Sequence, residues 1–269
     1  MPKFDTPQPI TATAEISAGS VRMIASDRDD TVVDVRPRDE SCSHDVRAAE
    51  QVRVEFNNGG LLVSSRRGFS FPRRGAVIVD IALPSGSRLN TAAASADITA
   101  DGSYADCVFA SASGDVEVGS VLGNLKADSA SGGITVADVS GSASVSTASG
   151  DAVIGTLDGD LKFRAASGSV VVKRLRGQLN TRTASGDVTV ASAVSGGVSA
   201  QTASGDVMVG IAEGTAAKLD VHTRSGAVHN SLTQSDGPSP GDETLVVHAQ
   251  TASGDVVVQR ASVDARSHG

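Results

Sequence analysis

The stretch Ala184–Val190, with the sequence ASGDVTV, decides the fold. Close variants of it recur through the chain, and the serine of each copy marks its position. Those serines are Ser95, Ser113, Ser131, Ser149, Ser167, Ser185, Ser204, Ser225 and Ser253. The first five intervals between them are 18 residues each, and intervals of 19, 21 and 28 residues follow. A fixed period of this kind indicates a repeat architecture in which each unit is stabilised by its neighbours.

Each repeat contains two segments in which apolar and polar residues alternate. Val188-Thr189-Val190 follows the Ser-Gly-Asp phrase, and segments such as Leu161-Lys162-Phe163 follow the next glycine. Alternation with period two, rich in valine and threonine, is typical of β-strands. Parallel strands stacked about 4.8 Å apart would bring equivalent valines of successive repeats into one ladder. We therefore predict an all-β, single-stranded parallel β-helix, or β-solenoid, with about 18 residues per coil.

The Ser-Gly-Asp-Val positions are expected to form the structural ladder of this solenoid. They are Ser113, Gly114, Asp115, Val116, Ser149, Gly150, Asp151, Ser185, Gly186, Asp187, Val188, Ser204, Gly205, Asp206 and Val207. Two other repeat folds fit less well. A β-propeller needs about 40 residues per blade, and a three-sided left-handed helix would show six-residue spacing of aliphatic residues, which is not evident.

The phrases Ala112–Val116, Ala184–Val188 and Ala252–Val256, with Leu83–Ser87 upstream, resemble a bacterial family of β-strand-repeat proteins known as putative adhesins. The repeated phrase is specific as a set, although a single copy carries no information. The resemblance covers nearly the whole chain. It implies a right-handed β-helix, surface or envelope-stress associations in some members, and no agreed activity. Periodicity alone does not fix the handedness.

Three regions are expected from the distribution of the repeat. Residues 1–90 alternate without the strict phrase and are predicted to form irregular β coils or a cap over the open end. Residues 91–260 would form the regular solenoid, interrupted by a loop at 231–244 that contains the sequence SDGPSPGD. Residues 261–269 would form a flexible tail.

Composition limits the classes of function. Aromatic residues make up 3% of the 269 residues, which removes the usual stacking platforms for sugars and bases. The net charge is -8, and all of it belongs to residues 91–269, where 19 acidic residues face 11 basic ones. A negative repeat region opposes nucleic-acid binding. No apolar stretch is long enough for a spanning helix and no secretory signal is seen, so we expect a cytoplasmic protein, with the cell surface or envelope as the alternative.

Candidate chemical sites are weak. The row of repeated aspartates could bind Ca²⁺, but hydrogen bonding of Asp and Ser to turn backbones explains it better. Asp158 and Asp160, near Arg174 and Arg176, could suggest a carbohydrate-active β-helix enzyme, although surface ion pairing is the simpler interpretation. Five unevenly spaced histidines do not indicate a metal site, and Cys42 and Cys107 are expected to be reduced thiols. No catalytic residue, metal or cofactor is predicted.

One segment has the composition of a contact region, because Ser65–Arg74 combines four arginines with two phenylalanines. The candidate contact residues are Arg66, Arg67, Phe69, Phe71, Arg73 and Arg74. They could engage anionic lipid at a membrane surface, nucleic acid, or an acidic partner such as the acidic face of another copy. Alternatively, the phenylalanines could plug the end of the solenoid. The sequence thus predicts a non-enzymatic scaffold or interaction protein, adhesin-like or self-assembling. The alternatives are a carbohydrate-active enzyme and an envelope-stress sensing or ligand-binding module.

Overall fold

The computed structural model describes residues 1–65, 75–233, 237 and 241–261. The described chain is almost entirely β-strand, with one helix, and divides into two compact units, Met1–Gly150 and Asp151–Gly269. Parallel strands dominate both units, so the prediction of an all-β fold resembling a parallel solenoid is confirmed.

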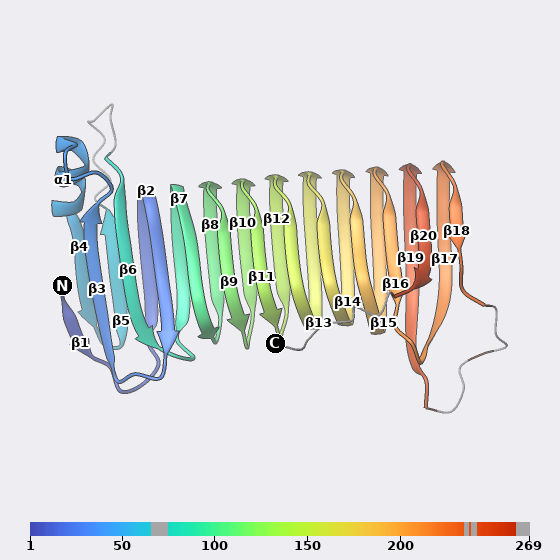
Figure 1. The fold of residues 1–269 in the computed structure, drawn as a ribbon, viewed down its shortest axis with the longest axis horizontal. Coiled ribbons are helices and arrows are strands. Elements are labelled where there is room, and N and C mark those ends of the chain that lie inside the picture. The colour runs from blue at the N-terminus through green and yellow to red at the C-terminus, as the bar shows by residue number, and fades with distance from the viewer. Residues whose placement is uncertain (66–74, 234–236, 238–240, 262–269) are drawn as a thin grey trace. The chain divides into compact units, whose positions relative to one another are not determined.

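The first unit contains twelve strands and the helix (Figure 1). They are β1 (Lys3–Asp5), β2 (Thr11–Ser26), β3 (Asp30–Pro37), α1 (Ser43–Glu50), β4 (Val52–Asn57), β5 (Gly60–Ser65), β6 (Val77–Pro84), β7 (Arg88–Tyr104), β8 (Cys107–Ser113), β9 (Val116–Val121), β10 (Leu125–Ser131), β11 (Ile134–Val139) and β12 (Ala143–Ser149).

Parallel pairing builds two walls in the first unit. One wall runs from β7 through β8 and β10 to β12, and the other runs from β7 through β9 to β11. The partners in these pairs are mostly 18 residues apart, as in Leu125↔Ala143 and Ile134↔Val116. Inward residues such as Val116, Ile134 and Leu125 are buried. The walls therefore face each other across an interior of mainly aliphatic side chains.

The start of the chain departs from the parallel pattern. β2 pairs in parallel with β5 and β6 on one side and with β7 on the other, so it lies inside the stack. β3 pairs antiparallel with β6, and β4 pairs antiparallel with β5. Helix α1, which the sequence did not predict, packs on β3 and β6, and its Asp45 accepts a hydrogen bond from the Ala76 N–H at 2.9 Å.

The second unit contains eight strands. They are β13 (Ala152–Ser167), β14 (Val170–Ser185), β15 (Val188–Ser204), β16 (Val207–Ile211), β17 (Thr215–Ser225), β18 (Val228–Asn230), β19 (Glu243–Ser253) and β20 (Val256–Arg260). All of their mutual pairings are parallel. Two walls result, and both have an unexpected order at one end.

The spatial order of the last coils differs from their order in the chain. β19 lies between β15 and β17, and β20 lies between β16 and β18. β17 and β18 thus lie at the end of the stack. The chain then returns and inserts β19 and β20 between them and the coil of β15 and β16 (Figure 1). Burial agrees with this order, since Val256 of β20 is 0% exposed and Val228, its partner on β18, is 44% exposed.

Candidate interaction surface

The repeated aspartates form a hydrogen-bonded row along one corner of each unit. In the second unit the Asp187 carboxylate accepts the backbone N–H of Asp206 at 2.8 Å, and Asp206 in turn accepts that of Asp255 at 2.7 Å. Asp255 accepts the N–H of Ala227 at 2.7 Å. Each side chain therefore binds the equivalent backbone position of the neighbouring coil, not its own turn as the sequence interpretation assumed.

The same row explains how serine can replace aspartate. Asp151 accepts the N–H of Ser169 at 2.8 Å, and the Ser169 hydroxyl accepts the N–H of Asp187 at 3.1 Å. In the first unit Asp97 and Asp115 repeat the arrangement. These carboxylates accept hydrogen bonds from the backbone of neighbouring coils. The described residues contain no group of three His, Cys, Asp or Glu side chains arranged to hold a metal ion.

The glycine of the repeated phrase is required by close contact between coils. A Cβ atom on Gly205 would lie 2.2 Å from the carbonyl oxygen of Gly186, and the φ angle of Gly205 is +149°. Gly254 has the same relation to Gly205, at 2.1 Å. Only glycine allows the corners to stack this closely. The Ser-Gly-Asp phrase is thus a device for coil stacking.

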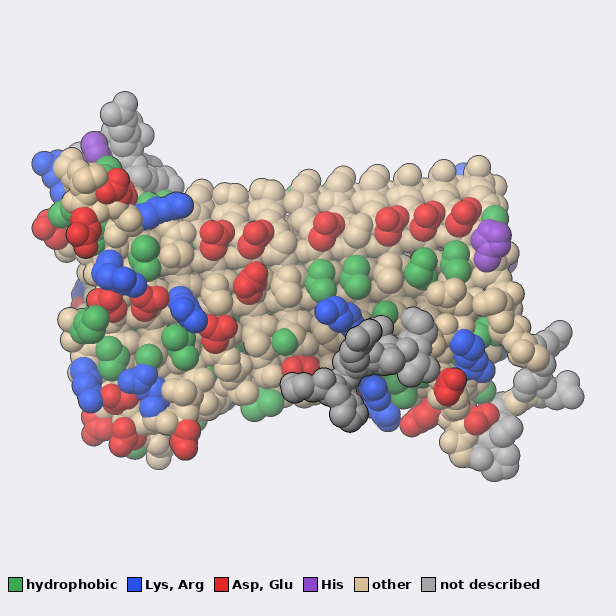
Figure 2. All heavy atoms as spheres, viewed as in Figure 1, with side chains coloured by type: hydrophobic (Ala, Val, Ile, Leu, Met, Phe, Trp, Pro, Cys, Tyr) green, Lys and Arg blue, Asp and Glu red, His purple; other side chains and the backbone are tan. Residues whose placement is uncertain are grey.

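An apolar row lies on the outside of the second unit, beside the carboxylates. Strand pairing aligns Val153, Val171, Thr189, Met208 and Val257, which are four apolar side chains and one threonine, and the same register ends at His229 of the terminal coil. Their neighbours along the strands point inward and are buried, whereas Met208 is 42% exposed and the other four are half-buried. Figure 2 shows apolar side chains next to a line of acidic ones. We call this surface, the five residues with Asp151, Asp187, Asp206 and Asp255, the acidic–apolar face.

The opposite wall of the second unit is polar on its outside. Lys162 and Arg164 on β13 and Arg182 on β14 are exposed, and the row that begins with Arg164 continues through Gln201 and Gln250. The two outer faces of this unit therefore carry different chemistry. Lys162, Arg164 and Arg182 are on one wall, and the row of repeated carboxylates with Met208 and the outward valines is on the other.

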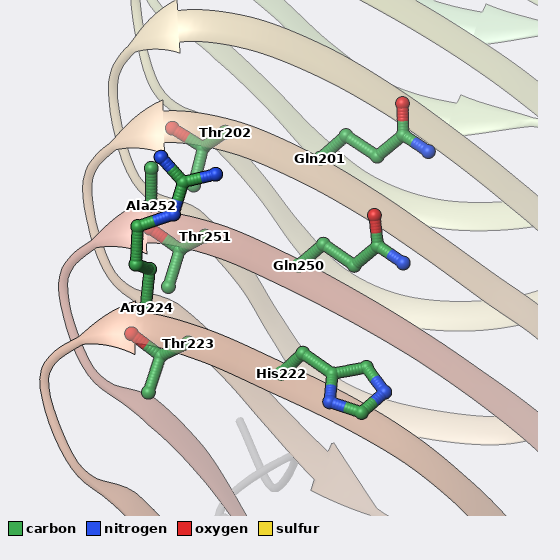
Figure 3. Close-up of a pocket in the computed structure, with 8 residues that line it drawn as sticks. All are labelled: Gln201, Thr202, His222, Thr223, Arg224, Gln250, Thr251 and Ala252. Carbon is green, nitrogen blue, oxygen red and sulfur yellow. The ribbon is translucent and has the colours of Figure 1, made fainter.

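A shallow hollow of about 420 Å³ lies at one end of the polar wall. It is lined by Gln201 and Thr202 of β15, Gln250, Thr251 and Ala252 of β19, and His222, Thr223 and Arg224 of β17. Figure 3 shows Gln201, Gln250 and His222 in a row along one side of it and the threonines along the other. The threonine hydroxyls donate to glycine carbonyls of neighbouring coils, as Thr223 does to Gly254 at 2.9 Å. The amides, imidazole and guanidinium are the groups that could meet a ligand.

An aspartate joins two histidines beside this hollow. The Asp220 carboxylate lies 3.0 Å from Nε2 of His222 and 3.0 Å from Nδ1 of His248. All three side chains are about half-exposed or more, so solvent weakens these contacts. The arrangement links β17 to β19 and was not predicted, because the two histidines are far apart in the sequence and meet only through the inserted coil.

The remaining predicted sites are placed as follows. The candidate contact residues Arg66, Arg67, Phe69, Phe71, Arg73 and Arg74 lie outside the described residues. Asp158 is in register with Arg176, whose guanidinium pairs with Glu243 at 3.3 Å, a contact that again depends on the inserted coil. Both cysteines are free thiols, and burial raises the pKa of Cys107 to about 12.

Parallel walls joined by Ser-Gly-Asp corners define a β-solenoid-like repeat domain. Within that class, residues 156–266 match the family model Toastrack DUF4097, a domain of unknown function. The match covers less than half of the chain. It confirms the resemblance to an adhesin-like repeat family of unknown function, which the repeated phrase indicates.

Two solved structures share the fold. A putative adhesin from Bacteroides fragilis is 10% identical, with a TM-score of 0.50 over 96% of this chain and 95% of that chain. A putative lipid binding protein from Parabacteroides distasonis is 15% identical, with a TM-score of 0.51 over 97% of this chain and 96% of that chain. At such identities the likeness concerns the fold alone. A search of curated protein sequences finds no relative.

Proposed function

We propose that this protein is a non-enzymatic interaction scaffold whose acidic–apolar face binds a protein partner. The observation that carries the proposal is the row of outward aliphatic side chains, including the exposed Met208, alongside a row of carboxylates. Exposed apolar groups flanked by charge are typical of protein interaction sites. The face favours a partner with apolar side chains flanked by basic ones.

The hydrogen bonds between coils support a scaffold role. Aspartate, serine and threonine are the abundant polar groups of the repeat, and their side chains bind the backbone of the neighbouring coil. A rigid stack of this kind presents side chains at fixed spacing on a flat wall. Rigidity lowers the entropic cost of binding an extended partner, because the face is already ordered.

Several finer features of the fold belong to the same proposal. We take the coil to be right-handed and single-stranded, as the family resemblance implies, and about 18 residues long, a length that the register of Ala152 with Val170 supports. We also keep residues 1–90 as a cap, 91–260 as the regular solenoid with a loop at 231–244, and 261–269 as a tail. Antiparallel pairing by β3 and β4 supports the cap.

Cellular location and membrane contact stay predictions. No helix among the described residues is long and apolar enough to cross a membrane. The arginine–phenylalanine segment remains a candidate for peripheral contact with anionic lipid. The solved structure described as a putative lipid binding protein gives one reason to include lipid vesicles among the binding partners tested.

The binding experiment compares two variants that introduce the same residue on opposite walls. Met208→Lys places a cation in the acidic–apolar face, and Ser199→Lys places one on the outside of the polar wall. Immobilised protein is used to capture partners from native extract, and bound proteins are quantified by mass spectrometry. We expect Met208→Lys to lower specific capture about tenfold and Ser199→Lys to leave it unchanged. Equal capture by all three proteins would contradict the proposal.

The absence of enzymatic activity is tested separately. Wild-type protein is incubated with a panel of acidic and neutral polysaccharides, and new reducing ends are measured. We expect none. Activity that disappears in Asp158→Ala or Asp160→Ala would instead establish the carbohydrate-active alternative.

A further inference from the structure

The coil formed by β17 and β18 ends the stack of the second unit. Within the described residues, β17 pairs with β19 alone and β18 with β20 alone, so one edge of each strand has no strand beside it. The inward side chains show the same asymmetry. Leu219 and Val221 of β17 are half-buried, whereas their partners on β19, Val247 and Ala249, are 0% exposed.

Backbone geometry identifies the groups at this edge. The N–H of Glu243 on β19 donates to the carbonyl of Gly214 at 3.0 Å. Alternate residues of a strand direct their N–H and C=O to opposite sides, so Ala217, Leu219 and Val221 direct theirs away from β19. An edge that combines backbone donors and acceptors with apolar side chains is a template for another strand.

Another parallel coil is a poor match for this edge. The carboxylate row needs an acceptor side chain in each coil to bind the N–H of the next, and in the last coil that position is Ala227. At the other terminus of the chain, the strands that pair outside the parallel walls, β3 and β4, are antiparallel. The row of acceptor side chains thus stops at the coil that contains β18. Neither end of the chain therefore favours the addition of a second copy as a further parallel coil.

We propose that the β17 edge binds the β17 edge of a second copy of this chain, as an antiparallel pair about a two-fold axis that passes through Leu219. A two-fold contact uses the same surface on both copies and closes after two. In this register the backbone groups of Leu219 meet those of the other Leu219, and Ala217 meets Val221. The backbone N–H and C=O groups of all three residues then have hydrogen-bonding partners. Their side chains remain on the interior side of the sheet.

Charge selects this register over its neighbours. With Leu219 at the axis, Lys218 of each copy faces Asp220 of the other, which gives two opposite-charge pairs. Shifting the axis to Val221 would place Lys218 opposite Arg224 twice, and like charges directly across a sheet are unfavourable. Shifting it to Ala217 would leave Lys218 opposite Ala216. The contact is distinct from the acidic–apolar face, so each proposal can fail while the other stands.

Disulfide trapping tests the register directly. In a Cys42→Ser background of the full chain, Leu219→Cys would face its own copy across the axis, within the Cα separation that a disulfide spans. Lys218→Cys is the matched control, because it faces Asp220. Under mild oxidation we expect Leu219→Cys to form covalent dimers and Lys218→Cys to remain mostly monomeric on a non-reducing gel. Equal cross-linking of both variants, or none in Leu219→Cys, would overturn the register.

Light scattering and charge exchange test the association without a cross-link. Wild-type protein should show a concentration-dependent dimer, Lys218→Glu should weaken it roughly tenfold through two repulsive pairs, and Lys218→Glu combined with Asp220→Lys should restore most of it. Lys162→Glu, on β13, should have no effect. Circular dichroism checks that each variant is folded. A wild-type chain that stays monomeric at all concentrations, as it would if its own residues covered the edge, would overturn the proposal.

Discussion

Each aspartate of the repeated phrase binds the coil that follows it in space. The contact joins an exposed carboxylate to a backbone N–H, and it places Asp187, Asp206 and Asp255 one above another. Stacked carboxylates repel one another, although solvent and salt reduce the repulsion. Aspartate is therefore present for its acceptor oxygen, and its charge is a cost.

Substitution of Asp187 should separate the acceptor from the charge. Asp187→Ala removes the partner of the Asp206 N–H and should lower the free energy of unfolding by about 1 kcal/mol. Asp187→Asn keeps an acceptor oxygen and removes one repulsive charge, so its stability should equal or exceed that of the wild type. Urea denaturation followed by circular dichroism measures both. An alanine variant as stable as the wild type would show that the contact contributes nothing.

Two glycines with positive φ angles provide a test of the close approach between coils. Gly205→Ala should destabilise the protein by about 1–3 kcal/mol or more, since strain at positive φ adds to a clash of Cβ with the Gly186 carbonyl. Gly214 has a φ angle of +72°, and no atom lies within 4 Å of the Cβ that Gly214→Ala would add. Its loss of stability, from the same measurement, should be smaller, because no neighbouring coil meets the added Cβ and its φ is closer to the left-handed region that other residues adopt. Equal losses would mean that the close approach to Gly186 contributes nothing.

Strand alternation and the 18-residue spacing were enough to predict most of the elements. The alternating runs Val188–Val190 and Leu161–Phe163 both lie within strands, and Val116 and Val188 pair with the equivalent residues of neighbouring coils as expected. Residue patterns report which face of a strand is buried, and this is a local property. Local patterns thus gave the strands, their inward faces and the parallel pairing.

The order of coils could not be predicted in the same way. Val228 and Val256 follow similar phrases that differ by Ala227 in place of Asp255, and this difference marks the terminal coil only once the aspartates are known to bind the next coil. The order of the last two coils depends on which arrangement buries more apolar surface of β17 to β20. This is a property of the assembled unit. Helix α1 was missed because the segment Ser43–Glu50 is short and mostly polar, with no buried residue. The acidic–apolar face was missed because outward valines look like any other strand residues.

The inserted coil gives a sharp prediction for two equivalent valines. Val256→Asp would bury an unpaired carboxylate and should cost about 3 kcal/mol or more. Val228→Asp, at the partner position on the exposed terminal strand, should cost less than about 1 kcal/mol. Thermal or urea unfolding of the two variants distinguishes the cases. If the coils stacked in chain order, the larger loss would occur at Val228.

Across the whole molecule, 31 acidic residues exceed 23 basic ones, and acid should affect its stability through particular carboxyl groups. The backbone N–H of Asn124, and then Arg88, lower the pKa of Asp106 below 3.8. Hydrogen bonds from Lys3 and Arg28 lower the pKa of Asp30 in the same direction. A lowered pKa in the folded state means that protonation favours unfolding.

Stability should consequently fall as the pH drops below about 4, with the contribution of these groups fully present above the ordinary pKa of 3.8. Asp106→Asn should flatten this part of the profile, since the amide does not titrate. Unfolding midpoints measured at a series of pH values from about 7 down to about 2 test the direction of the change. A profile that is unchanged in Asp106→Asn would assign the acid sensitivity to other carboxylates.

The insertion of β19 and β20 beneath β17 and β18 has a consequence for the synthesis of the chain. A ribosome releases β17 and β18 first, at a time when their final neighbours, β19 and β20, do not yet exist. These residues must either wait unpaired or stack transiently on β15 and β16, where the later coil belongs. In the second case β19 and β20 have to displace them. The unit therefore reaches its final order only after β20 has been synthesised, and a chain truncated before β19 would have only β17 and β18 to stack on β15 and β16.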